Sequence, residues 1–372
     1  MVHLFEPLTI RGVTIRNRIA LSPMCQYSSI DGYANNWHLI HLASRAVGGV
    51  GLVFTGAAAI EPRGRNSPPA LGIWSDGHIE PLIKVVSLIH QFGGVAGIQL
   101  GHAGRKASTA PPSQGKRVLS EAEGGWSSLV SASAKPFSDG SPVPEALSFE
   151  GIQQVIAAFV DAARRSVEAG FKVIEIHAGH GYLLHQFLSP LSNERNDEYG
   201  GSFENRTRLL REIVQEIRGV LPESHLLWVR ISATDWIENG WDIEQSTVLS
   251  NKLKSLGVDV IDCSSGGLLP DVDKIPFGSG YQTQFSERIR REAGIQTGTV
   301  GLITSPEQAD HIVRTGQADM VLLGRELLRD PYWAHRAAKQ LGYGNISPVQ
   351  YERAWANERG SHSSVQLNFI HS

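Results

Sequence analysis

The segment FKVIEIHAGHGY, residues 171–182, ends an apolar run in three polar side chains, His177, His180 and Tyr182. The run before them is rich in β-branched residues and apolar on both faces, which predicts a parallel strand covered by helices on each side. Two imidazoles three residues apart can each present a ring N–H to one acceptor atom, and a nearby phenol can supply a proton. The spacing therefore predicts a site that polarises an acceptor oxygen and protonates the same molecule.

Two other interpretations fit these histidines. His177, His180 and His185 have a spacing loosely similar to that of zinc ligands, although the HExxH signature is missing and the chain holds only two cysteines. Two histidines can also be structural residues that are hydrogen-bonded to the backbone inside a core. A functional site without a metal is the favoured interpretation, and the other two stay open.

The overall composition is that of an ordinary globular protein. The 372 residues carry 34 Lys and Arg against 37 Asp and Glu, a net charge of -3, which predicts neither a nucleic-acid nor a membrane partner. The N-terminal MVHLFEPLTIRG lacks the pattern of a secretory leader, and no stretch of 18 apolar residues occurs. Cys25 and Cys263 are too few for a disulfide framework. We therefore expect a cytoplasmic protein.

Short apolar runs alternate with amphipathic stretches along the chain. Eight of these runs are predicted to be strands, at residues 19–24, 51–58, 95–101, 171–177, 226–232, 258–264, 296–301 and 319–325. Eight strands that alternate with helices favour either a (β/α)8 barrel or a doubly wound sheet.

Two helix starts can be predicted in detail. Apolar residues recur from Ile152 to Val167 at the i, i+3, i+4 and i+7 positions, and Ser148 is the expected N-cap of that helix. Ser305 is expected to cap the helix before the last strand, with Pro306 in its first turn and Gln308 as the capping-box partner.

The positions of the polar residues favour the barrel. No G-x-G-x-x-G follows the first strand, and no Walker A sequence exists. Polar side chains that could do chemistry instead follow or end many different strands, and only a closed barrel brings all those strand ends to one mouth; they are Cys25, Gln99, His177, Arg230 and Arg325. The sequence thus predicts an α/β protein with a single-domain (β/α)8, or TIM, barrel.

Two further segments border the predicted mouth. Residues 102–147 are rich in Pro, Ser and Gly and too long for an ordinary loop, so we expect an excursion that covers the barrel mouth. Gly301 follows the seventh strand, and Gly324 and Arg325 follow the eighth, where barrels often bind a phosphate. Glycines after strands are also ordinary turn residues, so this pattern alone does not decide.

Four long motifs carry a resemblance to a known family. The stretches LFEPLTIRGVTIRNRIALSPMCQYS, IQLGHAGRKAS, HAGHGYLLHQFLSPLSNERNDEYGGSFENRTR and VLLGRELLRDPYW resemble the Old Yellow Enzyme family of FMN-dependent ene reductases. Cys25, Tyr27 and the His-x-x-His pair are similar to the branch of the xenobiotic reductases and their thermostable relatives. The resemblance implies an FMN-binding TIM barrel over residues 1–355 and leaves 356–372 as a C-terminal tail.

The resemblance also implies a set of cofactor contacts. Six residues are expected around the flavin ring and three at its phosphate: Pro23, Met24, Cys25, Ala58, Gln99 and Arg230, then Gly301, Gly324 and Arg325. Ala58 is expected to approach the ring through its backbone, and Cys25 could instead be an inert buried thiol. Arg230 as an ordinary ion-pair partner is disfavoured, because its strand is otherwise apolar and a lone buried charge is costly.

The implied reaction passes hydride from NADPH or NADH through flavin N5 to the β-carbon of an activated alkene, such as an enone, a nitroalkene or a quinone-like xenobiotic. The acceptor oxygen is expected between His177 and His180, with Tyr182 protonating the α-carbon. Tyr27 and Trp355 are expected to line the substrate pocket. The alternatives are a flavin-dependent ligand-sensing protein and an enzyme similar to dienoyl-CoA reductases that lacks their iron–sulfur domain.

The segment QYERAW, residues 350–355, carries residue types that are common at interfaces. The resemblance implies that a C-terminal arginine reaches into a neighbouring subunit, which assigns Arg353 to a shared substrate site. We therefore expect a homodimer or homotetramer.

Overall fold

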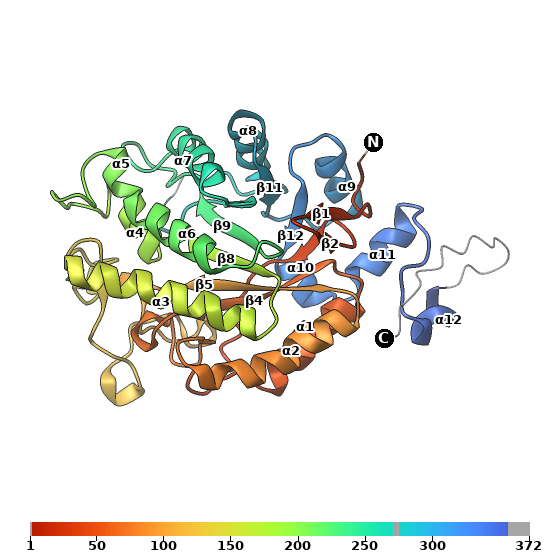
Figure 1. The fold of residues 1–372 in the computed structure, drawn as a ribbon, viewed down its shortest axis with the longest axis horizontal. Helices are drawn as coiled ribbons and strands as arrows, with labels where there is room; N and C mark the ends of the chain where they lie inside the picture. The colour runs from red at the N-terminus through yellow and green to blue at the C-terminus, as the bar shows by residue number, and fades with distance from the viewer. Residues whose placement is uncertain (1, 271, 273–274, 356–372) are drawn as a thin grey trace.

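The computed structural model describes residues 2–270, 272 and 275–355, so the predicted tail at 356–372 lies outside the described residues. Eight parallel strands close into a barrel in the order β10-β11-β12-β3-β4-β5-β8-β9 (Figure 1). They are β3 (Ile19–Leu21), β4 (Leu52–Ala59), β5 (Val95–Gly101), β8 (Val173–Ala178), β9 (Leu226–Ser232), β10 (Val260–Ser264), β11 (Gln296–Thr299) and β12 (Met320–Leu323). All eight predicted strands and the TIM-barrel fold are confirmed.

Helices surround this barrel, except for α12, which lies beyond α11 and apart from the barrel (Figure 1). They are α1 (Asn36–Val47), α2 (Ile79–Gln91), α3 (Phe149–Glu168), α4 (Leu183–Leu188), α5 (Phe203–Arg206), α6 (Arg208–Val220), α7 (Ile243–Ser255), α8 (Thr283–Ala293), α9 (Pro306–Arg314), α10 (Arg325–Arg329), α11 (Trp333–Gln340) and α12 (Glu352–Trp355). Short 3-10 turns occur at Pro62–Gly64, Asp76–His78, Gly104–Lys106, Pro112–Gln114, Glu121–Glu123 and Val349–Tyr351. None of the helices within the described residues is long and apolar enough to cross a membrane.

Both predicted helix starts have the expected N-caps. The Ser148 side chain accepts a hydrogen bond from the Gly151 N–H, and Ser305 accepts one from the Gln308 N–H. The expected capping box at Ser305 is wrong, because the Gln308 side chain accepts a hydrogen bond from the Ser279 hydroxyl at 2.6 Å instead. A hydrogen bond to Ser279, which is distant in the sequence, thus replaces the local capping-box contact at Ser305.

The barrel interior is apolar at its N-terminal end. Phe54 and Trp228 pack edge to face there, with ring centroids 5.5 Å apart. A two-stranded hairpin of β1 (Leu8–Ile10) and β2 (Val13–Ile15) contributes Leu8 and Ile15 to the same apolar cluster. This hairpin supports the end of the barrel opposite the predicted site.

The segment 102–147 contains a small sheet of β6 (Val130–Ser131) and β7 (Glu145–Ala146). Its first residues contact the loop that follows β10: Arg105 donates to the Leu268 carbonyl at 2.9 Å, and Lys106 donates to the Gly267 carbonyl at 2.7 Å. Further along, exposed turns have left-handed glycines, Gly115 at φ 88° and Gly124 at φ 84°. The excursion therefore lies against the C-terminal ends of the strands.

Candidate active site

The two predicted histidines meet at the C-terminal end of β8. His177 Nε2 and His180 Nδ1 are 3.3 Å apart, and the two rings are nearly perpendicular, at 86°. His180 has a left-handed backbone at φ 55°, which is uncommon for a residue with a side chain. Its N–H donates to Ser232 Oγ at 2.8 Å, and its carbonyl accepts from Lys106 Nζ at 2.8 Å. These contacts hold the strained residue in place.

Both imidazoles are neutral donors. Burial, with a further contribution from the Arg230 charge, lowers the pKa of His177 and of His180 well below the usual range. The Gly179 N–H donates to His177 Nδ1 at 3.3 Å, so the His177 proton is on Nε2 and faces His180. His180 Nε2 lies 2.7 Å from the Ser264 hydroxyl, which can donate or accept. When Ser264 donates to His180 Nε2, the His180 proton is on Nδ1. The N–H groups of His177 Nε2 and His180 Nδ1 then face the same region between the two rings.

The third histidine of the zinc alternative has a different environment. His185 Nδ1 accepts from the Gly181 N–H at 2.9 Å, and its Nε2 lies 2.9 Å from Asp235 Oδ1, with both side chains fully buried. Over the described residues, no three or more His, Cys, Asp or Glu side chains are grouped so that they could hold a metal ion. His185 is thus a structural residue that supports the loop after β8.

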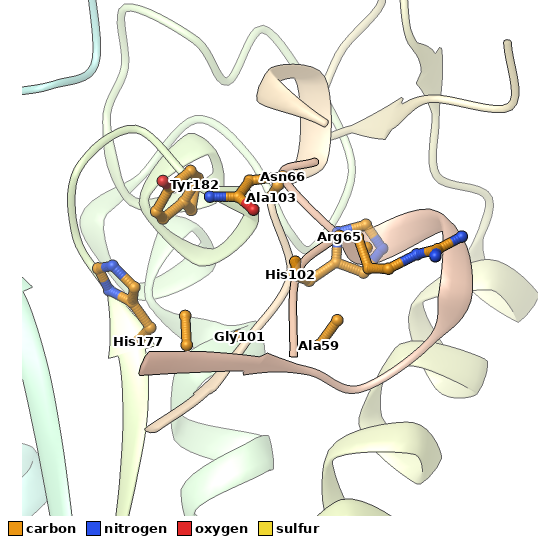
Figure 2. Close-up of a pocket in the computed structure, with 11 residues that line it drawn as sticks. Ala59, Arg65, Asn66, Gly101, His102, Ala103, His177 and Tyr182 are labelled. Carbon is orange, nitrogen blue, oxygen red and sulfur yellow. The ribbon is translucent and has the colours of Figure 1, made fainter. Parts of the chain in front are cut away.

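Tyr182 stands beside His177. Their ring centroids are 5.0 Å apart and the rings are nearly perpendicular. Burial raises the pKa of the Tyr182 hydroxyl, so the group keeps its proton at neutral pH. His177, Tyr182 and Asn66 border the same cavity (Figure 2). The structure thus brings the predicted oxyanion donors and the predicted acid together.

Asn66 was not predicted from the sequence. Its Nδ2 lies 3.5 Å from the Cys25 sulfur and 3.5 Å from the Tyr27 hydroxyl. Burial raises the pKa of the Cys25 thiol, and it raises the pKa of Tyr27 to about 12. No local pattern marks Asn66, because the loop that carries it is irregular and rich in proline and glycine.

A cavity of about 630 Å³ opens outside this group, lined by Tyr27, Tyr182 and residues of the excursion. Lys106 also lines it, and the Lys106 ammonium lies over the rings of Phe137 and Tyr182, 4.6 Å and 5.3 Å from their centroids. Burial, with the charges of Arg105 and Lys116, lowers the pKa of Lys106 to about 7. Sequence reasoning missed Lys106, although it lies in the IQLGHAGRKAS motif.

A polar layer lies below the histidines inside the barrel. Gln99 Nε2 donates to Glu175 Oε1 at 2.7 Å, and Arg230 Nε lies 3.2 Å from Asp262 Oδ2. The expectation that Arg230 is not an ion-pair partner is therefore wrong, because β10 supplies a carboxylate beside it. Arg230 Nη1 also donates to Ser22 Oγ at 3.0 Å. Gln99 keeps its carbonyl oxygen and one N–H for other partners.

A second cavity, of about 250 Å³, joins the ends of β11 and β12. It is lined by Gly301, Gly324 and Arg325, as the phosphate hypothesis requires, and by Arg230 at its inner end. Gly301 has φ 138°, and a Cβ there would lie 3.0 Å from Gln282 Nε2, so a side chain is strained and crowded at this position. Gly324 is less restricted, because a Cβ there would meet only Met24 Sδ at 3.6 Å.

The remaining flavin-contact candidates follow β3 or lie in β4. Pro23, Met24 and Cys25 are half-buried in the loop after β3. Ala58 is fully buried in the core around the barrel, so its side chain belongs to that core. The neighbouring Ala57 lines the cavity of Figure 2.

The structure does not bring Arg353 and Trp355 to this site within one chain. Trp355 packs edge to face on His335, with ring centroids 5.4 Å apart. His335 in turn lies against Gly49, just before β4, which places this contact at the N-terminal end of the barrel (Figure 1). Arg353 is exposed on the same short helix, α12. The assignment of Trp355 to the substrate pocket and that of Arg353 to a site shared with a neighbouring subunit stay predictions.

Comparison with known proteins identifies the family. The sequence model of the NADH:flavin oxidoreductase / NADH oxidase family matches residues 3–343. The NADPH dehydrogenase of Geobacillus sp. (strain WCH70) is 50% identical over 354 residues, which cover 95% of this chain and 98% of that protein. The NADPH dehydrogenase of Bacillus subtilis (strain 168) is 47% identical over 355 residues, covering 95% of this chain and 99% of that protein.

Solved structures agree with this. The old yellow enzyme homologue from Zymomonas mobilis has a TM-score of 0.77 at 26% identity, over 94% of this chain and 96% of that one. A 2-naphthoyl-CoA reductase has a TM-score of 0.81 at 23% identity, but this chain spans only 52% of its length, so that likeness shows the fold alone.

Proposed function

Because the chain belongs to the NADH:flavin oxidoreductase / NADH oxidase family, as an NADPH dehydrogenase of the Old Yellow Enzyme type, we propose that it reduces electron-poor alkenes conjugated to a carbonyl or nitro group. One observation carries this proposal. The two neutral imidazoles of His177 and His180 and the protonated Tyr182 lie side by side next to an open cavity. Such a set can hold an oxygen on which negative charge develops and protonate a carbon of the same molecule.

FMN fits the residues that surround this group. The cavity between Gly301, Gly324 and Arg325 offers backbone and a guanidinium group to a phosphate, and Arg230 lies between that cavity and the polar layer. We propose that FMN is held by Pro23, Met24, Cys25, Ala58, Gln99, Arg230, Gly301, Gly324 and Arg325. When bound, FMN supplies the hydride-transfer chemistry that links NAD(P)H to the alkene.

The side chains then divide the work on the substrate. His177 donates from Nε2 and His180 from Nδ1 to the carbonyl or nitro oxygen. For this the Ser264 hydroxyl turns from Gln282 Oε1 and donates to His180 Nε2, which leaves the His180 proton on Nδ1. Tyr182 gives its proton to the α-carbon, and its raised pKa keeps it in the acid form until then. Tyr27, which also lines the cavity, adds a hydrogen bond to the same oxygen.

Reconstitution and turnover test the proposal. We expect the purified protein to be yellow, with about one FMN per chain released by heat, and to oxidise NADPH when cyclohexenone is added. A colourless protein that cannot be reconstituted with FMN would contradict the cofactor. A flavoprotein that binds cyclohexenone but oxidises no nicotinamide would instead support the ligand-sensing alternative.

We also propose that the protein is cytoplasmic and works as a homodimer or homotetramer in which Arg353 reaches the partner's substrate site. Two facts support this assembly. Arg353 is exposed, and it lies on α12 with Trp355, away from the site of its own chain. An iron–sulfur enzyme similar to dienoyl-CoA reductases is a weaker candidate, because such a cluster is held by several Cys thiolates and the sequence contains only Cys25 and Cys263.

A further inference from the structure

Asn66 borders both the cavity of Figure 2 and the outer cavity, and it lies beside Cys25, Tyr27 and Tyr182. It lies in the loop after β4, far from all three in the sequence. Asn66 Nδ2 lies 3.5 Å from the Cys25 sulfur and 3.5 Å from the Tyr27 oxygen, and Asn66 and Tyr182 border the same two cavities. A single carboxamide thus lies among Tyr27 and Tyr182, which the proposed reaction places at the substrate, and Cys25, which it places at the flavin.

The loop holds Asn66 firmly in this position. Its backbone carbonyl accepts two hydrogen bonds from Thr109 of the excursion, at 2.9 Å from the N–H and 2.8 Å from the hydroxyl. The preceding Arg65 lies between two indole rings, 5.3 Å from the centroid of Trp74 and 4.9 Å from that of Trp126. Asn66 is therefore fixed from both sides.

A purely local role does not explain an asparagine here. Asn66 does not have the left-handed backbone that favours asparagine in turns. Its Oδ1 is buried and has no hydrogen-bond partner among the described residues, an arrangement that costs stability. An apolar residue of similar size would avoid that cost, so the amide N–H group must serve another purpose.

We propose that Asn66 is a positioning residue that holds Cys25, Tyr27 and Tyr182 in one cluster and donates to the Tyr182 oxygen once that residue has lost its proton. The second half rests on the proposed function, in which Tyr182 is the acid. A phenolate in a buried site needs a donor, because burial disfavours its charge. The Asn66 amide supplies an N–H donor to this oxygen and adds no second positive charge beside that of Arg230.

Stopped-flow kinetics of the FMN-loaded enzyme test this. Asn66→Leu should slow the alkene step about tenfold, the loss expected for one hydrogen bond to a charged oxygen, and leave reduction by NADPH unchanged. In a Tyr182→Phe background, Asn66→Leu should cause no further loss, because it acts through the missing hydroxyl. Asn251→Leu, on the exposed face of α7, is the matched control and should change neither step.

A second measurement does not depend on turnover. Asn66 also donates to the Cys25 sulfur and so favours its thiolate, and we expect Asn66→Leu to slow alkylation of Cys25 by an uncharged maleimide. Cys263 is fully buried and serves as the unreactive internal reference. Asn66→Asp removes the N–H donor at constant size and should act in the same direction if the leucine variant does not fold.

Several results would overturn the proposal. Equal losses in both half-reactions, losses of Asn66→Leu and Tyr182→Phe that multiply, or faster alkylation of Cys25 would each show that the side chain only fills space. A Tyr182→Phe enzyme that reduces enones at the normal rate would instead reject the acid role of Tyr182. In that case slower alkylation of Cys25 would still support the cluster, and only the second half of the proposal would fall.

Discussion

The carboxyl groups of Glu175 and Asp262 give a prediction that is independent of turnover. Both side chains are fully buried, on β8 and β10, alternate strands of the barrel. Glu175 Oε2 and both Asp262 oxygens make no hydrogen bond among the described residues, although Arg230 Nε lies 3.2 Å from Asp262 Oδ2 as an ion-pair partner. Because the pKa of each of these two carboxyl groups is raised, we expect them to share one proton. Burial, then the Asp262 charge, raises the pKa of Glu175 well above its usual range.

The change to test is Glu175→Gln. A glutamine can still accept from Gln99 Nε2 through its oxygen, and its own amide can donate to Asp262 as the protonated acid does. The folded variant should therefore keep its hydrogen bonds at every pH. The hydrogen bonds of the wild-type protein should depend on pH. The folded protein must retain a proton on the carboxyl pair, whereas the unfolded chain releases it above the ordinary glutamate pKa of 4.5.

The direction in which the free energy of unfolding changes with pH follows from proton linkage. A raised pKa in the folded state gives stability that is complete below the unfolded pKa and is lost as the pH rises toward the folded one. Over that window, the free energy of unfolding of Glu175→Gln minus that of the wild type should rise by about 1.4 kcal/mol per pH unit. At pH 5 the two proteins should be similar in stability, and at pH 8 the variant should be the more stable one.

Urea unfolding from pH 5 to pH 8, with FMN held at one concentration, measures this difference. Glu216→Gln on the exposed face of α6 makes the same chemical change at the surface and is the matched control. A difference that stays constant with pH would refute the shared proton. A variant that is less stable than the wild type at pH 8 would show that Glu175 is folded as a stabilised carboxylate.

Three further predictions concern the proposed reaction. His177→Ala should slow alkene reduction about a hundredfold or more and abolish tight binding of phenols, while FMN stays bound; an unchanged phenol affinity and charge-transfer band would make the histidine structural. Tyr182→Phe should leave reduction by NADPH nearly intact and slow reoxidation by enones, with nitroalkenes spared because a nitronate can leave unprotonated; stopped-flow traces with equal losses in both steps would reject the acid. Arg353→Ala should change the KM for substrate or nicotinamide more than the FMN content, and light scattering that shows a fully active monomer would reject a shared site.

The barrel could be predicted from the sequence because its signals are local. Each strand is a short apolar run, and α3 has a complete helical repeat with a serine cap, so neighbours in the sequence are sufficient. The sites of chemistry on β8 could be predicted for the same reason. His177, His180 and Tyr182 are close in the chain, and their relative positions follow from a strand that ends in a turn.

The parts that could not be predicted depend on register and tertiary contacts. Arg230 pairs with Asp262 because β9 and β10 are aligned with these residues directly opposite each other, and no pattern within either strand indicates that alignment. Asn66 reaches Cys25 from a loop whose course is fixed by Thr109 and by two indole rings. Gln308 bonds Ser279 for the same kind of reason, which is why its predicted role was wrong.

The residues at the entrance of the outer cavity belong to the excursion, whereas the reacting groups belong to the barrel, and this separation is useful for protein engineering. The donors and the acid stand on and just after β8, whereas Lys116, Arg117 and Val118 border the outer cavity from an exposed part of the excursion. The turns on either side, at Gly115 and Gly124, have open space around them. Exposed turns of this kind tolerate insertions and deletions better than buried segments. Libraries that vary the length and sequence of residues 115–124 therefore offer a route to new substrate ranges with the barrel unchanged.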